Sequence, residues 1–123
     1  MSDTNKKLVI IGTHAEENPD KATLPFVLGS AALAMEVDVT VVLQTTGVFL
    51  AKKGYAAHVH APGFPPLTDL LEGYLEAGGT LMVCSPCLSA RNIGAADLLP
   101  QAQIVAGATL VAESLAADST LTY

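Results

Sequence analysis

The segment Gly78–Arg91, GGTLMVCSPCLSAR, decides how the rest of the chain can fold. Its apolar run Thr80–Val83 follows two glycines, and such a run between turn residues is typical of a buried strand. The dipeptide Ser85-Pro86 then favours the start of a helix, because serine is a common N-cap and proline suits the first helical position. Both cysteines of the chain therefore fall at one strand-to-helix turn, with Cys84 ending the strand and Cys87 in the first turn of the helix.

Strand and helix patterns alternate along the whole chain. Apolar or β-branched runs predict strands at Lys7–Gly12, Val37–Leu43, Thr80–Val83, Gln103–Ala106 and Thr120–Tyr123. Apolar residues at helical spacing predict helices at Asp20–Met35, Val48–Lys53, from Leu67 to the Gly78-Gly79 pair, after Ser85, and at Gly107–Ala117. This alternation predicts the α/β class, a three-layer α/β/α fold with a parallel sheet of about five strands, as one domain over residues 1–123.

The composition limits the classes of function. Half of the 123 residues are hydrophobic and only 15% are charged, so we expect other subunits of a homo-oligomer to cover part of the surface. A net charge of −6 without a basic stripe argues against nucleic acid as a partner. No apolar run is long enough to cross a membrane and no signal-peptide pattern is present, so we expect a cytoplasmic protein.

The C-x-x-C pair carries the reactive groups of the chain. In a reducing compartment this spacing indicates redox, sulfur or metal chemistry rather than a structural disulfide. A helix start stabilises thiolates, which favours Cys87 as the more reactive thiol. Arg91, one turn further on, either reaches the same pocket or is a solvated charge, and Ser85 lies in the pocket without an evident base. The alternative is that Cys84 and Cys87 are two small hydrophobic side chains packed at a tight turn.

A loop rich in proline and glycine, Tyr55–Pro66, holds two further candidates, His58 and His60. Together with Cys84 and Cys87 they offer four ligands of the kinds that zinc prefers. The chain has only one C-x-x-C pair, so we expect no metal and no cofactor. We expect instead that the loop borders the Cys84 pocket and brings one imidazole towards it.

Other readings of the motifs fit less well. Thioredoxins open a helix with C-x-x-C after a strand, but here a long helix lies between the first two strands and the cysteines follow the third. Dinucleotide-binding, P-loop and G-x-S-x-G patterns are missing from the sequence. The acidic residues Glu16, Glu17 and Asp20 stand before or at the start of the first helix, where we expect them to be dipole partners rather than catalysts.

Taken in order, these motifs resemble the DsrE/DsrF-like family, which includes the TusD-type subunits of sulfur-relay systems. The resemblance covers nearly all of Lys7–Tyr123. It rests on the apolar first strand, the helix residues Ala22–Ala34, the run Val39–Leu43 with Thr46–Val48 and Ala51–Gly54, the stretch Leu71–Gly79, and above all Val83–Cys87 with Ala90-Arg91.

The resemblance implies sulfur trafficking. In the family, a cysteine at the tip of the third strand carries a persulfide and exchanges it with a small TusA-like carrier protein, and that cysteine matches Cys84. A second cysteine matching Cys87 is present in only some relatives. Family members form trimers, hexamers or heterohexamers, so a homo-oligomer is expected, a trimer before a hexamer.

Three hypotheses about function follow. The favoured one is a sulfurtransferase or sulfur carrier that acts through a persulfide on Cys84, with Cys87 as a helper that releases the sulfur. The second is a thiol–disulfide or peroxide-handling redox protein that uses the pair Cys84 and Cys87. The third is a non-catalytic assembly subunit.

Overall fold

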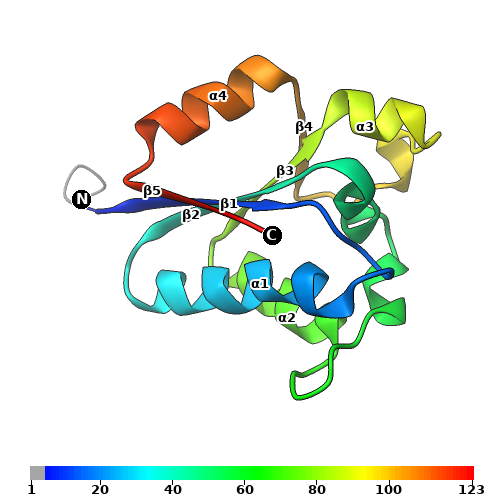
Figure 1. The fold of residues 1–123 in the computed structure, drawn as a ribbon, viewed down its shortest axis with the longest axis horizontal. Helices are drawn as coiled ribbons and strands as arrows, with labels where there is room; N and C mark the ends of the chain where they lie inside the picture. The colour runs from blue at the N-terminus through cyan, green and yellow to red at the C-terminus, as the bar shows by residue number, and fades with distance from the viewer. Residues whose placement is uncertain (1–4) are drawn as a thin grey trace.

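A single parallel sheet forms the centre of the computed structural model, which describes residues 5–123. Its five strands lie in the order β4-β3-β2-β1-β5, and every neighbouring pair is parallel (Figure 1). The strands are β1 (Lys7–Gly12), β2 (Asp38–Leu43), β3 (Thr80–Cys84), β4 (Ala102–Val105) and β5 (Ser119–Thr122). The predicted α/β fold with a parallel sheet of five strands is thus confirmed.

Helices cover both faces of this sheet. Figure 1 shows α1 and α2 on one side, and α4 and α3 on the other. The α-helices are α1 (Pro19–Ala34), α2 (Leu67–Glu76), α3 (Ser85–Ala90) and α4 (Gly107–Ala116), and the 3-10 segments are η2 (Thr45–Ala51), η3 (Tyr55–His58) and η4 (Ala95–Asp97). The predicted helix over Val48–Lys53 is therefore the 3-10 segment η2, which begins three residues earlier and ends two residues earlier.

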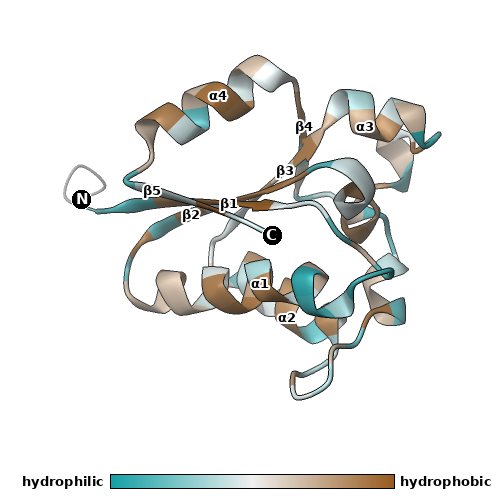
Figure 2. Cartoon of the chain, viewed as in Figure 1, coloured by the Kyte–Doolittle hydropathy of each residue, from teal (hydrophilic) through white to brown (hydrophobic). Residues whose placement is uncertain are grey.

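The two faces of the sheet are buried to different degrees. Alternate strand residues such as Ile10, Val41 and Leu81 join the large core beneath α1 and α2, as the period of two requires. The opposite face contributes a small cluster of Val9, Val42 and Met82 beneath α4. No residue of α4 is buried, although Figure 2 colours much of this helix as hydrophobic.

One tyrosine of α2 fixes the position of β3. The buried Tyr74 hydroxyl donates to the carbonyl oxygen of Thr80 at 2.6 Å and accepts from the Val41 amide at 3.1 Å. Its ring lies edge-to-face on Phe26, with the ring centroids 5.5 Å apart. A Cβ atom on Gly79 would overlap the Tyr74 ring, so only glycine fits at that position. Tyr74 thereby holds the start of the strand that ends at Cys84.

Candidate functional site

The carboxyl ends of the parallel strands bring the candidate site together. Cys84 is the last residue of β3 and pairs with Val105 at the end of β4, while its neighbour Val83 pairs with Leu43 at the end of β2. Leu43 in turn pairs with Gly12 of β1. The loops that follow these strands therefore meet at the edge of the sheet where open α/β folds bind ligands.

Both cysteines are free thiols, and both are half-buried. Burial raises the pKa of the Cys84 thiol, and the neighbouring Cys87 thiol raises it further. The backbone N–H of Cys87 and the charge of Arg91 act on the pKa of Cys84 in the opposite direction. The two sulfurs thus form one interacting pair.

A residue of the neighbouring strand end contacts Cys87. The backbone N–H of Thr45, which begins η2, donates a hydrogen bond to the Cys87 Sγ at 3.2 Å. Thr45 has a φ of +50°, an unusual value for a β-branched residue. Sequence analysis gave Thr45 no role at this site. Its place two residues after the end of β2, the strand next to β3, was the available signal.

Arg91 and Ser85 both lie beside the cysteines. Arg91 follows α3 and donates from Nη1 to the carbonyl oxygen of Cys87 at 3.2 Å, so its half-buried side chain turns back over the helix. Ser85 is half-buried at the first position of α3, next to Cys84. These contacts gather four of the six predicted site residues at one turn.

The two histidines make other contacts. His58, in η3, packs edge-to-face against Tyr55, with ring centroids 6.3 Å apart. The His60 Nε2 lies 2.7 Å from the carbonyl oxygen of Phe64. Within residues 5–123 neither imidazole has a hydrogen bond to a cysteine, and Figure 1 shows their loop on the side of α1 and α2, away from α3. Their approach to Cys84 stays a prediction about neighbouring subunits.

An ion pair that sequence analysis missed lies after β1. His14 Nδ1 contacts the carboxylate of Glu17, whose other oxygen accepts from the Ala15 N–H at 2.8 Å and the Thr46 hydroxyl at 3.3 Å. Burial alone would raise the pKa of Glu17, but the Ala15 amide and His14 hold it below the usual value. The Glu17 carboxylate therefore links the loop after β1 to the first turn of η2.

Asn18, not Glu17, caps the first helix. Its side-chain oxygen accepts from the Lys21 N–H at 3.2 Å, and Pro19 occupies the first helical position. Of the acidic residues expected to act on the helix dipole, only Asp20 lies in the first turn of α1.

The four residues considered as zinc ligands, two cysteines and two histidines, do not form a metal site within the described part of the chain. Among residues 5–123, no group of three histidine, cysteine, aspartate or glutamate side chains has the arrangement of a metal site. In the same part of the chain, no helix is both long and apolar enough to span a membrane.

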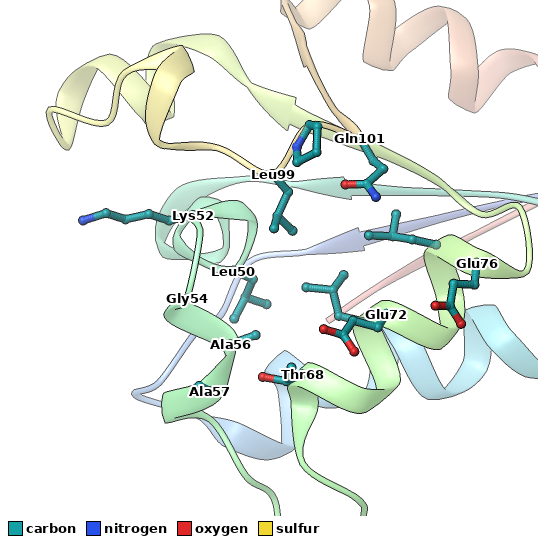
Figure 3. A pocket seen from close by; sticks show the side chains of 13 residues that line it. Leu50, Lys52, Gly54, Ala56, Ala57, Thr68, Glu72, Glu76, Leu99 and Gln101 are labelled. Carbon is teal, nitrogen blue, oxygen red and sulfur yellow. The ribbon is translucent and has the colours of Figure 1, made fainter.

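A hollow of about 390 Å³ lies elsewhere, between α2, the η2–η3 segment and the chain before β4 (Figure 3). Leucines such as Leu50 and Leu99 form its apolar lining, and Lys52, Glu72 and Glu76 add charges. None of the predicted site residues lines it. A much smaller hollow adjoins Cys84 beneath the first turn of α4, and its other lining residues are Val42, Gln44, Val105, Ala106, Gly107 and Leu110.

The fold and the site place this chain among small parallel α/β proteins that carry a free thiol pair where the third strand ends. The chain belongs to the DsrE/DsrF-like family, whose sequence model matches residues 6–123. Membership supports a function of the sulfur-relay type at the level of the family.

Two archaeal relatives come from Methanocaldococcus jannaschii. The uncharacterized protein MJ0760 is 35% identical over 92 residues, which is 75% of this chain and 34% of MJ0760. The chain thus spans about a third of the length of that relative. The uncharacterized protein MJ0989 is 27% identical over 117 residues, covering 95% of this chain and 99% of its own.

Solved structures share the fold. The YchN protein from E. coli superposes with a TM-score of 0.80 at 22% identity, over 96% of this chain and 99% of YchN. MTH1491 from Methanobacterium thermoautotrophicum, a protein of unknown function, gives a TM-score of 0.76 at 15% identity, over 97% of this chain and 100% of its own. At these identities the likeness concerns the fold alone.

Proposed function

We propose that this protein is a sulfurtransferase or sulfur carrier that accepts sulfane sulfur on Cys84 as a persulfide or thiosulfonate. The observation that carries the proposal is the position of Cys84. It ends β3 at the ligand-binding edge of the sheet, half-buried, with a second thiol and a cation beside it. Family membership makes sulfur the cargo that this arrangement fits best.

The chemistry is an ordinary displacement at sulfur. The Cys84 thiolate attacks a terminal sulfur of a polysulfide, one S–S bond breaks, and the shortened polysulfide leaves with the bonding electron pair. An acceptor thiolate then attacks the outer sulfur of the Cys84 persulfide, and the Cys84 thiolate leaves. Alternatively, the Cys87 thiolate attacks the Cys84 Sγ, which forms a Cys84–Cys87 disulfide and releases hydrosulfide.

The proposed exchange partner is a TusA-like sulfur carrier protein, which matches the family-level function and the open edge at Cys84. The reaction needs a free thiol at Cys84, so we place it in the reducing cytoplasm, with neither nucleic acid nor membrane as a partner. The apolar, unburied α4 supports a homo-oligomer, a trimer before a hexamer. In such an assembly, a second copy would cover the exposed apolar residues of α4.

Mass spectrometry of the intact protein tests the proposal. The reduced protein is incubated with polysulfide, thiosulfate or tetrathionate, then freed of reagent and weighed. A gain of sulfur or of a thiosulfonate group, removed again by dithiothreitol, is the expected result. An unchanged mass with all three donors would contradict it and favour a non-catalytic assembly subunit.

A second candidate is a thiol–disulfide or peroxide-handling redox protein. The feature that favours it is the position of both thiols at one strand-to-helix turn, where Cys87 acts on the pKa of Cys84, because closely placed thiols oxidise to a disulfide. Loss of two hydrogens from the mass, without any gain of sulfur, would select this alternative.

A further inference from the structure

We infer that Thr45 is a positioning residue, which holds the Cys87 sulfur so that it takes the proton of Cys84 when Cys84 attacks a sulfur donor. The inference rests on the proposed function and adds to it a division of labour between the two thiols. Cys84 is the nucleophile, Cys87 is its base, and the Thr45 amide stabilises the charge on the base.

The direct observation is the hydrogen bond from the Thr45 N–H to the Cys87 Sγ at 3.2 Å. A backbone N–H is a donor only, so the sulfur accepts in this contact. An N–H donated to sulfur favours the thiolate over the thiol, because the charged form is the stronger acceptor. The Thr45 N–H therefore gives the Cys87 sulfur a donor that any negative charge on that sulfur would use.

The conformation of Thr45 is costly and yet held in place. Its φ of +50° lies in the left-handed region, which β-branched residues avoid. Such a conformation persists only where the surroundings determine it, and it is concentrated at functional sites. In this conformation the Thr45 N–H donates to the Cys87 Sγ and, within residues 5–123, to no neighbouring strand.

Three hydrogen bonds and the close approach of Gly47 to the end of β1 fix this conformation. The hydroxyl groups of Thr45 and Thr46 both donate to the carbonyl oxygen of Thr13, at 2.6 and 3.1 Å. The Gln44 amide donates to the carbonyl oxygen of Gly12 at 2.9 Å. A Cβ atom on residue 47 would overlap that same Gly12 oxygen, so glycine at this position permits the close approach of the two loops.

Cys84 complements this arrangement. Burial and the neighbouring Cys87 thiol raise the pKa of the Cys84 thiol, so Cys84 is the thiol whose proton has to be removed in the proposed step. In the proposed step this proton moves to the Cys87 Sγ while the Cys84 sulfur bonds to the terminal sulfur of a polysulfide. The terminal S–S bond of the polysulfide breaks, and the polysulfide leaves one sulfur shorter with two negative charges. The single negative charge that the two cysteines shared before the step is then on the outer sulfur of the Cys84 persulfide.

Other titratable groups face the pair. Arg91 of α3 is bonded to the Cys87 carbonyl, and the pair of His14 and Glu17 reaches the Thr45 loop through the Thr46 hydroxyl. The hollow on the α4 side of Cys84 is lined by uncharged residues. Glu17 and Arg91 therefore have to be varied alongside Thr45 when pH profiles are compared.

The test measures the alkylation rate of each cysteine by iodoacetamide in the reduced protein, resolved by peptide mass spectrometry between pH 5 and pH 10. This readout does not depend on sulfur loading. In the wild type, Cys87 is expected to react faster than Cys84 at neutral pH. Thr45→Ala should slow Cys87 by about three- to tenfold, the usual effect of weakening one hydrogen bond to a charged group.

Matched variants separate this effect from general loosening of the loop. Thr45→Ser keeps the hydroxyl anchor on Thr13 and should restore the rate of Cys87. Thr68→Val removes a hydroxyl of α2 that lines the separate hollow and should change the rate less than about twofold, because this hydroxyl lies outside the cysteine turn and the Thr45 loop. An amide-to-ester replacement at residue 45 removes the N–H alone, and should slow Cys87 as much as Thr45→Ala or more.

Equal Cys87 rates in the wild type, Thr45→Ala and the ester variant would overturn the inference, as would a wild type in which Cys84 reacts first at neutral pH. Polysulfide loading distinguishes this failure from that of the proposed function. If the labelling order depends on Thr45 but no sulfur is loaded, the proposed function fails. If sulfur is loaded normally and Thr45 has no effect on labelling, only the role of Thr45 fails.

Discussion

Arg91 donates a hydrogen bond from Nη1 to the carbonyl oxygen of Cys87, at 3.2 Å, and its charge acts on the other cysteine, Cys84. The bond holds the guanidinium against the turn that contains both sulfurs. A cation kept in this place favours any anion formed there, whether a thiolate or a persulfide. The arginine therefore adjusts the reactivity of Cys84 without contacting its sulfur through a hydrogen bond.

Arg91→Gln is expected to raise the pKa of Cys84, because the charge that lowers it is lost while burial continues to raise it. The alkylation midpoint of Cys84 should move to higher pH, and polysulfide loading near neutral pH should slow by roughly two- to fivefold. Lys21→Gln removes an exposed charge of the same sign on α1 and is the control. An unchanged midpoint in Arg91→Gln would show that Arg91 has only a structural role.

The two cysteines are expected to differ in sulfur loading. Cys84→Ser should abolish the gain of mass with polysulfide or tetrathionate, because the strand-end sulfur that carries the cargo is gone. Cys87→Ser should still load, more slowly, and should release sulfur differently since no disulfide can form within the chain. Intact mass after identical exposure measures both. Normal loading of Cys84→Ser together with none in Cys87→Ser would reverse the assignment.

Assembly is expected to depend on α4. Leu115 is 82% exposed and Val111 57% exposed, on a helix with no buried residue. Leu115→Glu would place a charge in the proposed subunit interface and should lower the mass measured by light scattering at micromolar protein. Ala57→Glu, an exposed change in η3, should leave the mass unaltered. A wild-type protein with the mass of a monomer would contradict the homo-oligomer itself.

Two glycines of one region are expected to respond in opposite ways to alanine. Gly79→Ala drives a methyl group into the buried Tyr74 ring and should cost about 1–3 kcal/mol of unfolding free energy, as overpacking does. Gly73→Ala, in α2, meets no atom within 4 Å and should stabilise by about 0.5–1 kcal/mol. Urea denaturation measures both. Equal stability of the two variants would show that Tyr74 moves aside.

Alkaline pH is expected to destabilise the protein through Tyr74. Burial raises the pKa of Tyr74, so the folded state keeps the phenol proton that the unfolded chain loses above about pH 10. The unfolded state binds fewer protons in that range, and stability therefore falls as pH rises. Tyr74→Phe should be less stable near neutral pH, because Val41 loses its acceptor, but should show a shallower alkaline decline. Parallel pH curves for the two proteins would contradict this.

The sequence allowed the fold to be predicted because its signals are local. The β-branched run that ends at Leu43 predicts one strand, and the glycine pair before Thr80 marks the start of the next. The alternation of strands with helices then predicts a parallel sheet. The same logic predicted that Cys84 lies at the edge where strands end. Contacts between loops carry no such periodic signal. Thr45 contacts Cys87 only because two separate strand ends meet, and His14 contacts Glu17 within one short irregular loop, so sequence analysis missed both.

The approach of the histidine loop to the cysteines is still a prediction about an assembly. The loop was expected to border the Cys84 pocket because it returns at the carboxyl edge of the sheet, and within this chain His58 and His60 have partners inside their own loop and η3. The sequence predicted a surface to be covered by other subunits, and in the structure α4 has no buried residue although it carries the exposed Val111 and Leu115. An apolar stripe in a sequence gives no indication of whether its own chain or another one covers it.

Cys84 and Cys87 belong to elements that differ in local stability. Cys84 is part of an inner strand bordered by β2 and β4, whereas Cys87 is in a helix of six residues outside the sheet. Amide hydrogen exchange should accordingly be slow along β3 and fast in α3, since short helices with few buried contacts open locally. Any bond between the two sulfurs would then form by motion of α3 towards a stationary Cys84. Cys84, which carries the sulfur, would keep its position through a catalytic cycle, and Cys87 would move with α3.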